Sequence, residues 1–516
     1  MKAARLTAAG AVLLALGAIA GAAQLAGPGS PGPARATAPP RLVAVTSAVR
    51  ACPPIPGGGP GTVAFIARPS PAPQAGPGQA GPGQAGPGQA ELAPLPSADA
   101  ALRAAAPISQ TEPGVLSTLT IPAAQSVAKK AATVPQGWSV TATGTMAQAM
   151  EAEEATGSGP ASVRCGEPGS DLWFVGPGQQ NGAGQIQLNL MNVDALAASV
   201  NVSVVTDAGP VQAGNDTGIT VPPRQTVTES LSALAAGSSV AAIEVRTSMG
   251  RVAADVSEST AQGGTVSWLP ATAPPSTQLL IPGVASSGSA ARLFIVVPGS
   301  SDARVSVLAI TSQGRYRPFG AQPVDVPGDS ASYVPLTPLG GTASALELTA
   351  NVPVAAAVLV PGTGMGTFTA STAPISEQAV VAGNTSGSGL STTVVLSAPA
   401  GPARVRLTEL TPPAGSRASG ATAGQQGAAS QQVTASQQVT DPAGRTLAVP
   451  VTIPRGGGRG AAFAVVITPL AGSGPLYAAR VQTQGQGSVV SIIPAISALT
   501  TISLPPVRDS YAAISP

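Results

Sequence analysis

After Cys165 this chain repeats itself about every 100 residues, and this periodicity constrains its fold more than any other feature. Three segments open with an apolar run that ends at a glycine: DLWFVG at Gly176, LLIPG at Gly283 and AVVAG at Gly383. Each continues with alternating apolar and polar residues, anchored at Val200, Val305 and Val405. Period-2 alternation places successive side chains on opposite faces, so each stretch predicts a half-buried β-strand.

Each segment also carries two apolar arms near its end, which we interpret as a hairpin. The first arms contain Ile243, Leu346 and Phe463, and the second arms begin at Val252, Val354 and Leu476. The last interval is longer than the previous one by about 20 residues, and a low-complexity stretch at 412–438 accounts for the excess.

Segments of this length, with some seven short strands each, predict an all-β fold class of tandem immunoglobulin/fibronectin-like β-sandwich domains after an N-terminal apolar helix. Glycine (62) and proline (53) are frequent throughout, which favours short strands and turns over helices. A propeller is disfavoured, because a blade has about half this length. Each repeat should be a self-contained sandwich, arranged like beads on a string. The Cys…Trp…Cys spacing of antibody domains is missing.

The beginning of the chain is typical of an export signal. Residues 1–26 contain Lys2 and Arg5, then an apolar run, with an A-x-A cleavage site at Ala20 and Ala22. The run is also long enough to span a bilayer, so cleavage and retention as a membrane anchor both stay open. Either outcome places the rest of the chain outside the cytoplasm, secreted or anchored.

The two cysteines, Cys52 and Cys165, fit an exported chain with one disulfide. The alternative is two unrelated buried thiols. With no histidine in the chain, Ser/His and Cys/His nucleophiles and ordinary zinc sites are excluded. Charged residues make up 9% and the net charge is +2, which argues against a nucleic-acid partner.

The expected organisation has seven parts along the chain. They are a signal peptide or anchor (1–26), a Pro/Gly/Ala-rich linker (27–40), an N-terminal β domain (41–165) with a low-complexity insert (68–111), sandwich repeats at 166–271, 272–373 and 374–505, the last with a disordered insert (411–440), and a tail (506–516).

The chain resembles an actinobacterial family of exported or membrane-anchored proteins catalogued as a domain of unknown function. The leader, the early Cys52, a second cysteine (Cys165) just before the pair Trp173 and Phe174, and the repeated V-x-A arms carry the resemblance. It covers about residues 41–500 and implies a location in the cell envelope, with no activity to carry over.

Few residues qualify as a catalytic site. The densest acidic cluster is Glu151, Glu153 and Glu154, for which we expect a solvated helix end or loop. Glu244 and Glu347 occupy matching outward positions in two repeats, where solvation is again expected. Ser/Lys catalysis would need Lys129 or Lys130, and neither lies in an S-x-x-K motif.

A binding site has one candidate. Sugar-binding sandwiches display exposed aromatic side chains, and Trp173 with Phe174 lies between the second cysteine and the first repeat. These two are our candidates for ligand contact, although the three tryptophans (Trp138, Trp173 and Trp268) are more simply core residues.

Three functional hypotheses follow. The leading one is a non-enzymatic structural or protein-interaction scaffold of the envelope, without cofactor or metal, because sandwiches in series offer exposed sheet edges to an unknown envelope protein. The second is a protein that binds cell-wall polysaccharide. The third is a carboxylate-dependent hydrolase. Membrane contact is expected only through the N-terminal segment.

Overall fold

The computed structural model describes residues 41–504 except 57–58, 69–84, 97–107, 122–136, 157–160, 180–183, 212–217, 261–265, 286–289, 319, 321, 338, 340–342, 363, 386–388, 412–433, 453–461 and 486–487. Ala44–Thr501 forms one compact unit, and the described residues outside it are 41–43 and 502–504. Strands β1 (Arg41–Ala44) and β35 (Thr501–Leu504) pair as a two-stranded sheet. The expected leader (1–26), linker (27–40) and tail (506–516) lie outside the described residues.

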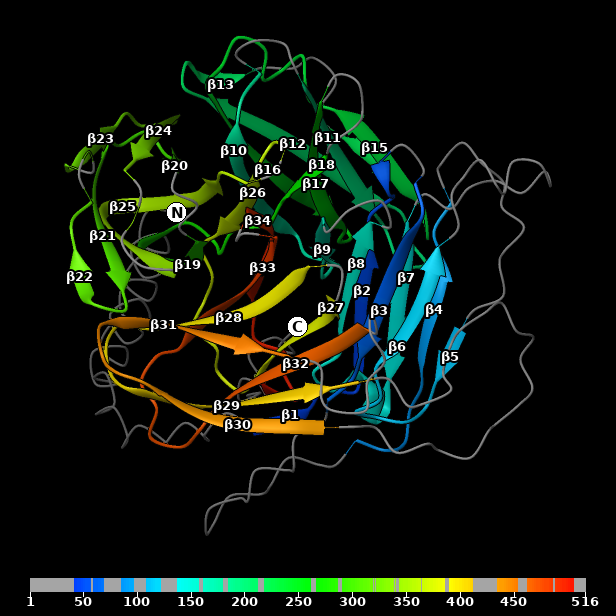
Figure 1. Ribbon diagram of the computed structural model, residues 1–516. Helices are drawn as coiled ribbons and strands as arrows, with labels where there is room; N and C mark the ends of the chain where they lie inside the picture. Colours follow the sequence, from blue (N-terminus) through cyan, green and yellow to red (C-terminus); the bar gives the residue numbers. More distant parts are fainter. Residues whose placement is uncertain are drawn as a thin grey trace, which may run out of the picture. The chain divides into compact units, whose positions relative to one another are not determined.

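The fold is all-β, as predicted (Figure 1). The described part of the chain contains no helix that is long and apolar enough to cross a membrane. One 3-10 turn, η2 (Gly144–Ala147), precedes β8. Strands β2 to β34 form four quarters, each with two antiparallel sheets that pack face to face.

The bounds of the strands in the first and second quarters are as follows. The first has β2 (Ser47–Cys52), β3 (Gly61–Ile66), β4 (Ala90–Pro94), β5 (Ile108–Gln110), β6 (Ser117–Ile121), β7 (Trp138–Thr143), β8 (Glu151–Thr156) and β9 (Ser162–Arg164). The second has β10 (Asp171–Pro177), β11 (Gly184–Met191), β12 (Ala198–Thr206), β13 (Gly209–Val211), β14 (Ile219–Val221), β15 (Thr226–Ser230), β16 (Val240–Met249), β17 (Ala253–Thr260) and β18 (Val266–Leu269).

The third and fourth quarters follow the same plan. The third has β19 (Ser276–Ala285), β20 (Ala291–Val297), β21 (Ala303–Thr311), β22 (Gly314–Tyr316), β23 (Val324–Val326), β24 (Ser330–Leu336), β25 (Ala343–Val360) and β26 (Thr367–Ala370). The fourth has β27 (Ala379–Thr385), β28 (Leu390–Ala398), β29 (Ala403–Leu410), β30 (Thr434–Asp441), β31 (Arg445–Val451), β32 (Ala462–Pro469), β33 (Tyr477–Gln484) and β34 (Ser488–Ala495).

All four quarters share one strand order. In the first quarter the sheets run β2-β7-β4-β5 and β6-β3-β8-β9, and in the fourth β27-β32-β29-β30 and β31-β28-β33-β34. The second and third quarters repeat this order, with β25 long enough to run through both sheets of its quarter. The segment that the sequence treats as a separate N-terminal β domain is therefore a fourth copy of the repeat.

Alternation predicted the inward faces of the central strands correctly. Val200, Val202 and Val204 on β12 are buried, and Ser203 between them is exposed. Val305 and Val307 on β21, and Val405 and Leu407 on β29, are likewise buried beside an exposed arginine. These valines and leucines form the interior of each sandwich, as β-branched residues on a pleated face favour.

The hairpin interpretation of the late apolar arms is wrong. β16 and β17 lie in different sheets of the second quarter, as do β32 and β33 in the fourth. β25 passes from one sheet to the other without a break. Alternation reports which face of a strand is buried, and it does not report which strand is the hydrogen-bonded partner. The repeated V-x-A arms mark a crossing between sheets.

Strands of the fold lie inside the ranges expected for both low-complexity inserts, so each insert is shorter than the sequence suggested. β4 and β5 fall within 68–111, yet β4 pairs with β7 in the sheet of the first quarter. β30, which includes most of the residues of the repeated SQQVT, pairs with β29 along its whole length. Low complexity was a poor guide here, because polar residues with small side chains fit an edge strand that is half exposed.

The quarters do not stand apart like beads on a string. Neighbouring quarters share apolar clusters. Phe294 and Phe368 of the third quarter pack with Trp173 of the second, and Ala479 and Ile492 of the fourth pack with Ile281 of the third. The last quarter returns to the first, where Val380 and Val466 pack against Ala64 and Ile66. Ala51 and Leu95 of the first quarter meet Met191 and Ala253 of the second. The sheet contacts within Ala44–Thr501 therefore form a closed circuit.

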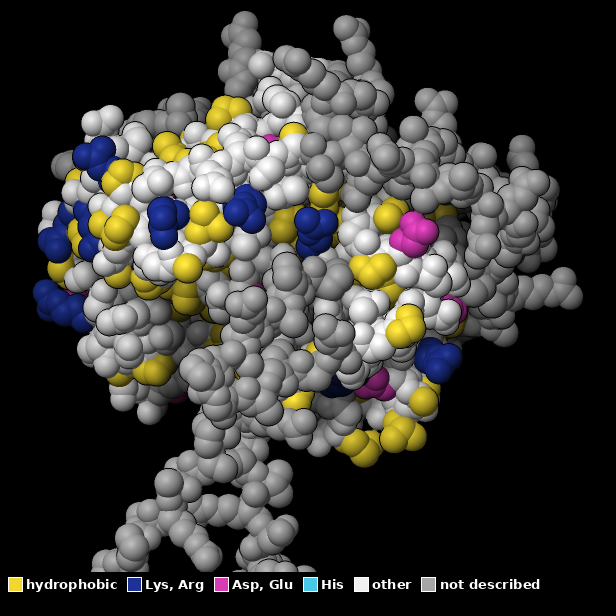
Figure 2. Space-filling view, turned by 90° about the horizontal axis from the view of Figure 1, so that it is seen from below, with side chains coloured by type: hydrophobic (Ala, Val, Ile, Leu, Met, Phe, Trp, Pro, Cys, Tyr) yellow, Lys and Arg dark blue, Asp and Glu magenta, His cyan; other side chains and the backbone are white. Residues whose placement is uncertain are grey.

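The length of the repeat, about twice that of a propeller blade, does not argue against a propeller in this circuit. Each repeat of about 100 residues supplies two small sheets, mostly of four strands, so the length per sheet is close to that of a propeller blade. The connectivity differs from a propeller, whose blades are built from consecutive strands, because here the strands of each repeat alternate between two sheets. On the face shown in Figure 2, a few charged side chains lie among uncharged polar and apolar ones.

The disulfide prediction is confirmed: Cys52 and Cys165 are bonded across 113 residues and are fully buried. Chain entropy for a loop of 113 residues predicts that reduction lowers the free energy of unfolding by about 4–5 kcal/mol. Denaturant titrations with and without reductant measure this loss, and a Cys52→Ala/Cys165→Ala double variant should show no response to reductant. An equal midpoint for oxidised and reduced wild type would contradict the prediction.

The close approach of the third and fourth quarters can be tested at Gly283. This residue has φ +74°, and a Cβ there would lie 2.5 Å from the Cβ of Ala479. Gly218 has nearly the same φ, +76°, with nothing within 4 Å. Gly218→Ala should cost only the backbone strain of about 1–2 kcal/mol. Gly283→Ala should cost a further 1–3 kcal/mol, roughly, from overpacking. Equal losses in urea titrations of the two variants would mean that the sheets are not in close contact.

Candidate functional site

The acidic cluster of β8 is buried, and the expectation that it is solvated is wrong. Glu151, Glu153 and Glu154 are 1%, 2% and 1% exposed. β8 is a central strand of its sheet, and neighbouring quarters cover this part of the sheet. The sequence suggested the end of a helix or a loop, where acidic side chains are normally solvated, but these residues lie on strand β8. In this fold the outer faces of the sheets pack against other quarters, so the polar positions must find partners inside the protein.

Glu151 is neutralised by two arginines from its own quarter. Its Oε1 accepts hydrogen bonds from Nη2 of Arg50 on β2 at 3.0 Å and from Nη2 of Arg164 on β9 at 2.5 Å. Arg50 also pairs with the more exposed Glu167 at 3.4 Å. Burial alone would raise the pKa of Glu151, but the charges of Arg164 and Arg50 outweigh it and hold the pKa below its usual range.

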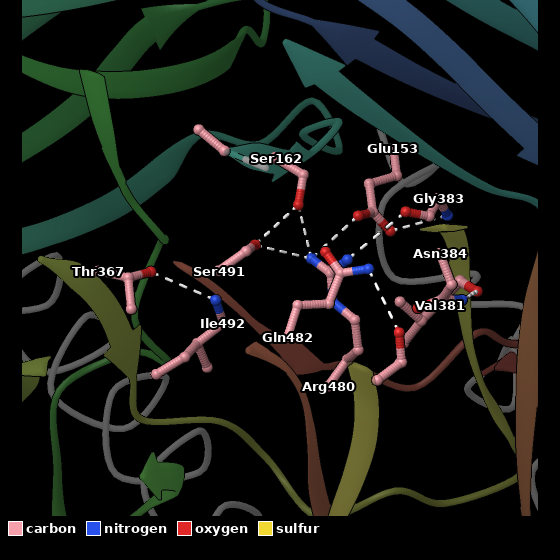
Figure 3. A network of polar contacts seen from close by, with 12 residues as sticks. Glu153, Ser162, Thr367, Val381, Gly383, Asn384, Arg480, Gln482, Ser491 and Ile492 are labelled. Atoms are coloured by element: carbon pink, nitrogen blue, oxygen red, sulfur yellow. Dashed lines mark hydrogen bonds and ion pairs between the residues drawn. The ribbon is translucent and has the colours of Figure 1, made fainter. Parts of the chain in front are cut away.

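Glu153 joins the first quarter to the last. Its Oε1 lies 3.1 Å from Nη2 of the fully buried Arg480 on β33, and its Oε2 accepts the backbone N–H of Gly383 at 2.9 Å. Arg480 also donates to Oγ of Ser162 at 2.6 Å and to Oγ of Ser491 at 2.9 Å (Figure 3). Burial lowers the pKa of Arg480, and Glu153 opposes that effect. The network fastens β8 and β9 to β33 and β34.

Glu154 has no such partner. Neither of its carboxyl oxygens has a hydrogen-bond partner among the described residues, and Asp255 on β17 adds a repulsive charge. Burial, with that repulsion, raises the pKa of Glu154 well above its ordinary value. Burial also raises the pKa of Asp255 well above its ordinary value, against the attraction of Arg164. The two carboxyls are therefore an acidic pair without a paired cation.

A cavity of about 420 Å³ lies beside this pair, where segments of all four quarters meet. Its walls come from β9, β10, β17, β18 and β34 and from the segments that follow β18 and β26. Glu167, Asp171 and Pro274 in its lining are exposed, so the cavity opens to solvent on their side. Ser162 and Ile492 line its buried part. Its volume falls within the range of small-molecule pockets.

Several buried polar groups of this pocket lack partners among the described residues. They are Oδ2 of Asp255, Nε1 of Trp268, Oγ of Ser371, Oγ1 of Thr372 and Nε of Arg164. Asp255 is 5% exposed, Trp268 7% and Ser371 0%. An unpaired buried donor or acceptor costs about 1–3 kcal/mol, so a cluster of them around one cavity points to a bound molecule that completes their hydrogen bonds.

The structure separates the two aromatic candidates. Trp173 on β10 lines the pocket, while Phe174 points into the apolar cluster shared with the third quarter and is fully buried. Trp138 lies on β7, outside the pocket. Trp268, which the sequence treated as a core residue, forms part of the pocket wall. Lys129 and Lys130 lie outside the described residues.

The outward glutamates of the repeats are only partly buried. The Glu244 side chain is 14% exposed and pairs with Arg246, and that of Glu347 is 29% exposed and pairs with Arg315 at 3.4 Å. Neither lines the pocket. Nothing in the sequence singled out Asp255, since an acid in the strand AADVSEST is an ordinary outward position. Among the described residues, no group of three or more acidic or cysteine side chains is placed to hold a metal ion.

Glu154→Gln tests the unpaired carboxyl. The native state holds the Glu154 proton more tightly than the unfolded state, whose pKa is near 4.5. The wild type therefore loses stability as pH rises above 4.5, by up to about 1.4 kcal/mol per pH unit from this group, until pH passes the native pKa. Glutamine does not titrate, so urea titrations should show the variant gaining on the wild type between pH 5 and 8.

Glu151→Gln is the matched control on the same strand. It removes the partner of the buried Arg50 and the partly buried Arg164, so at pH 8 it should lower the free energy of unfolding by about 3 kcal/mol. Losses of similar size for both variants at pH 8 would show that Glu154 is ionised and paired, contrary to the expected result.

The comparisons with known proteins identify a family and give no activity. No curated protein matches the chain. A family model described as a family of unknown function, DUF5719, matches residues 123–436, which include Trp173, Asp255 and Trp268 and end before Arg480. The match covers more than half of the chain and supports the likeness to a domain of unknown function seen in the sequence. This chain belongs to the family of unknown function DUF5719.

Proposed function

We propose that this protein is a non-enzymatic, extracytoplasmic binding protein whose pocket holds a sugar unit of a cell-wall polysaccharide. The observation that supports the proposal is the set of unpartnered polar groups around a pocket with two tryptophans in its wall. Of the three hypotheses drawn from the sequence, glycan binding is the one that uses this pocket.

The lining offers the chemistry that a pyranose ring needs. An indole ring such as that of Trp173 or Trp268 can pack against the apolar C–H face of a sugar. The hydroxyls of the sugar can accept from Nε1 of Trp268, donate to Oδ2 of Asp255, and do either with Oγ of Ser371. A cavity of 420 Å³ has room for one or two sugar rings, because small-molecule pockets start at about 300 Å³.

The location outside the cytoplasm also remains part of the proposal. The buried disulfide is consistent with an oxidising compartment, where such bonds persist. Cleavage or retention of residues 1–26 stays a prediction, as does the absence of a nucleic-acid partner.

The other two hypotheses have less support from the site. The scaffold hypothesis relied on separate sandwiches in series, whereas Ala44–Thr501 is one compact unit. The hydrolase hypothesis relied on Glu151, Glu153 and Glu154, and arginines hold the first two of these. Release of reducing sugar from the oligosaccharides would support the hydrolase hypothesis, and capture of a protein partner would support the scaffold hypothesis.

Tryptophan fluorescence and calorimetry with soluble oligosaccharides test the proposal. Titration of the full chain with chitotriose and cellotriose should quench emission and give saturable binding by at least one of them. Trp173→Ala should weaken that binding at least tenfold, since stacking on a ligand ring contributes on the order of 1–3 kcal/mol. Trp173→Phe keeps an aromatic ring and is less disruptive to folding, so this variant should lose less affinity.

Trp138→Phe is the matched control, because Trp138 lies outside the pocket and should leave the affinity unchanged. Three results would count against the proposal. They are the absence of binding by any oligosaccharide at millimolar concentration, equal affinity of wild type and Trp173→Ala, and cleavage of the oligosaccharide during the titration.

A further inference from the structure

The charges around the pocket narrow the class of sugar, an inference that rests on the proposed function. Three carboxyl side chains line the pocket: Glu167 and Asp171 at its mouth and Asp255 in its wall. Arg164 is the lining residue with a positive charge, and its Nη2 is already bound to Glu151 at 2.5 Å. The protein thus brings more negative than positive groups to this cavity.

Two other arginines reach the carboxyls at the mouth, and each is shared with a second glutamate. Arg50 binds Glu151 and reaches Glu167 at 3.4 Å. Arg246 lies between Glu244 at 2.5 Å and Asp171 at 3.6 Å. Within the described residues, Asp255 has no ion-pair partner within 4.0 Å, and the unpaired Glu154 lies near enough to repel it.

Asp255 is the group that a ligand would neutralise. Its Oδ2 is buried, unpartnered and part of the pocket wall, so a cation in the pocket could donate a charge-assisted hydrogen bond to it. The tryptophans act in the same direction, because the face of an indole ring attracts an ammonium group. A neutral sugar hydroxyl would satisfy the hydrogen bond but would not offset the cost of ionising the buried carboxyl of Asp255.

We propose that the pocket selects an amino sugar with a free ammonium group, which binds to the carboxylate of Asp255, over the N-acetylated sugar. The sugar ring packs against the tryptophans, and its hydroxyls form hydrogen bonds with Nε1 of Trp268 and Oγ of Ser371. Acetylation removes the positive charge and replaces the compact ammonium with a bulkier neutral amide, so the modified sugar loses the contact with Asp255.

Competition calorimetry with four probes tests this selectivity on the wild-type chain. The probes are a glucosamine trimer, chitotriose as its N-acetylated equivalent, cellotriose as a neutral trimer and cyclohexylamine as an amine without a sugar. The glucosamine trimer should bind at least tenfold more tightly than chitotriose, cellotriose and cyclohexylamine. Raising the salt concentration should weaken the affinity for the glucosamine trimer and leave the affinities for chitotriose and cellotriose unchanged.

Asp255→Asn should remove this preference, reducing the affinity for the glucosamine trimer at least tenfold and leaving that for chitotriose nearly unchanged. Glu258→Gln is the matched control on the same strand, because Glu258 does not line the pocket and should keep the preference. Trimers that bind equally tightly to the wild type would overturn the amino-sugar inference and leave sugar binding intact. Binding of cyclohexylamine alone would overturn both.

Discussion

The contact between the first and last quarters is the constraint on which the rest of the structure depends. Glu153 and Arg480 lie more than 300 positions apart in the chain, yet they form a buried ion pair inside a layer of small apolar side chains. Burying two charges is costly, and only the hydrogen bonds from Gly383 and to Ser162 and Ser491 make it tolerable. The pair therefore favours one register between the quarters, and through that register it favours the closed circuit of sheets.

Periodicity in the sequence predicted the strands and their inward faces, because Val200, Val305 and Val405 obey a local rule that needs no knowledge of partners. It could not predict how the quarters associate. Ala64 and Ile66 look like the second face of a strand, and whether water or another sheet covers that face depends on residues more than 300 positions away. The prediction of hairpins near Val252 and Val354 was wrong for the same reason, because a pattern of burial does not identify the hydrogen-bonded neighbour of a strand.

The site was predictable only in part. Trp173 was expected to contact a ligand and lines the pocket, while its neighbour Phe174 points to the opposite face, as adjacent strand residues must. Asp255 and Trp268 carried no signal of their own. They acquire a role because β17 and β18 end beside β9 and β34, and this proximity follows from the closure of the circuit. The cluster of glutamates was noticed, but its burial could not be read from three acids in one strand.

Closure and ligand binding are therefore physically linked. Ile492 and Ile493 of the last quarter form part of the pocket wall, so the pocket is complete only when that quarter has packed against the first. A ligand that binds only the closed form stabilises it by an amount that grows with the logarithm of ligand concentration over Kd. The unpaired carboxyls Glu154 and Asp255 act in the opposite sense, since their burial opposes closure whenever they ionise. A positively charged ligand at Asp255 would offset that cost. Ligand binding would therefore explain an acid in the pocket wall, where folding alone does not.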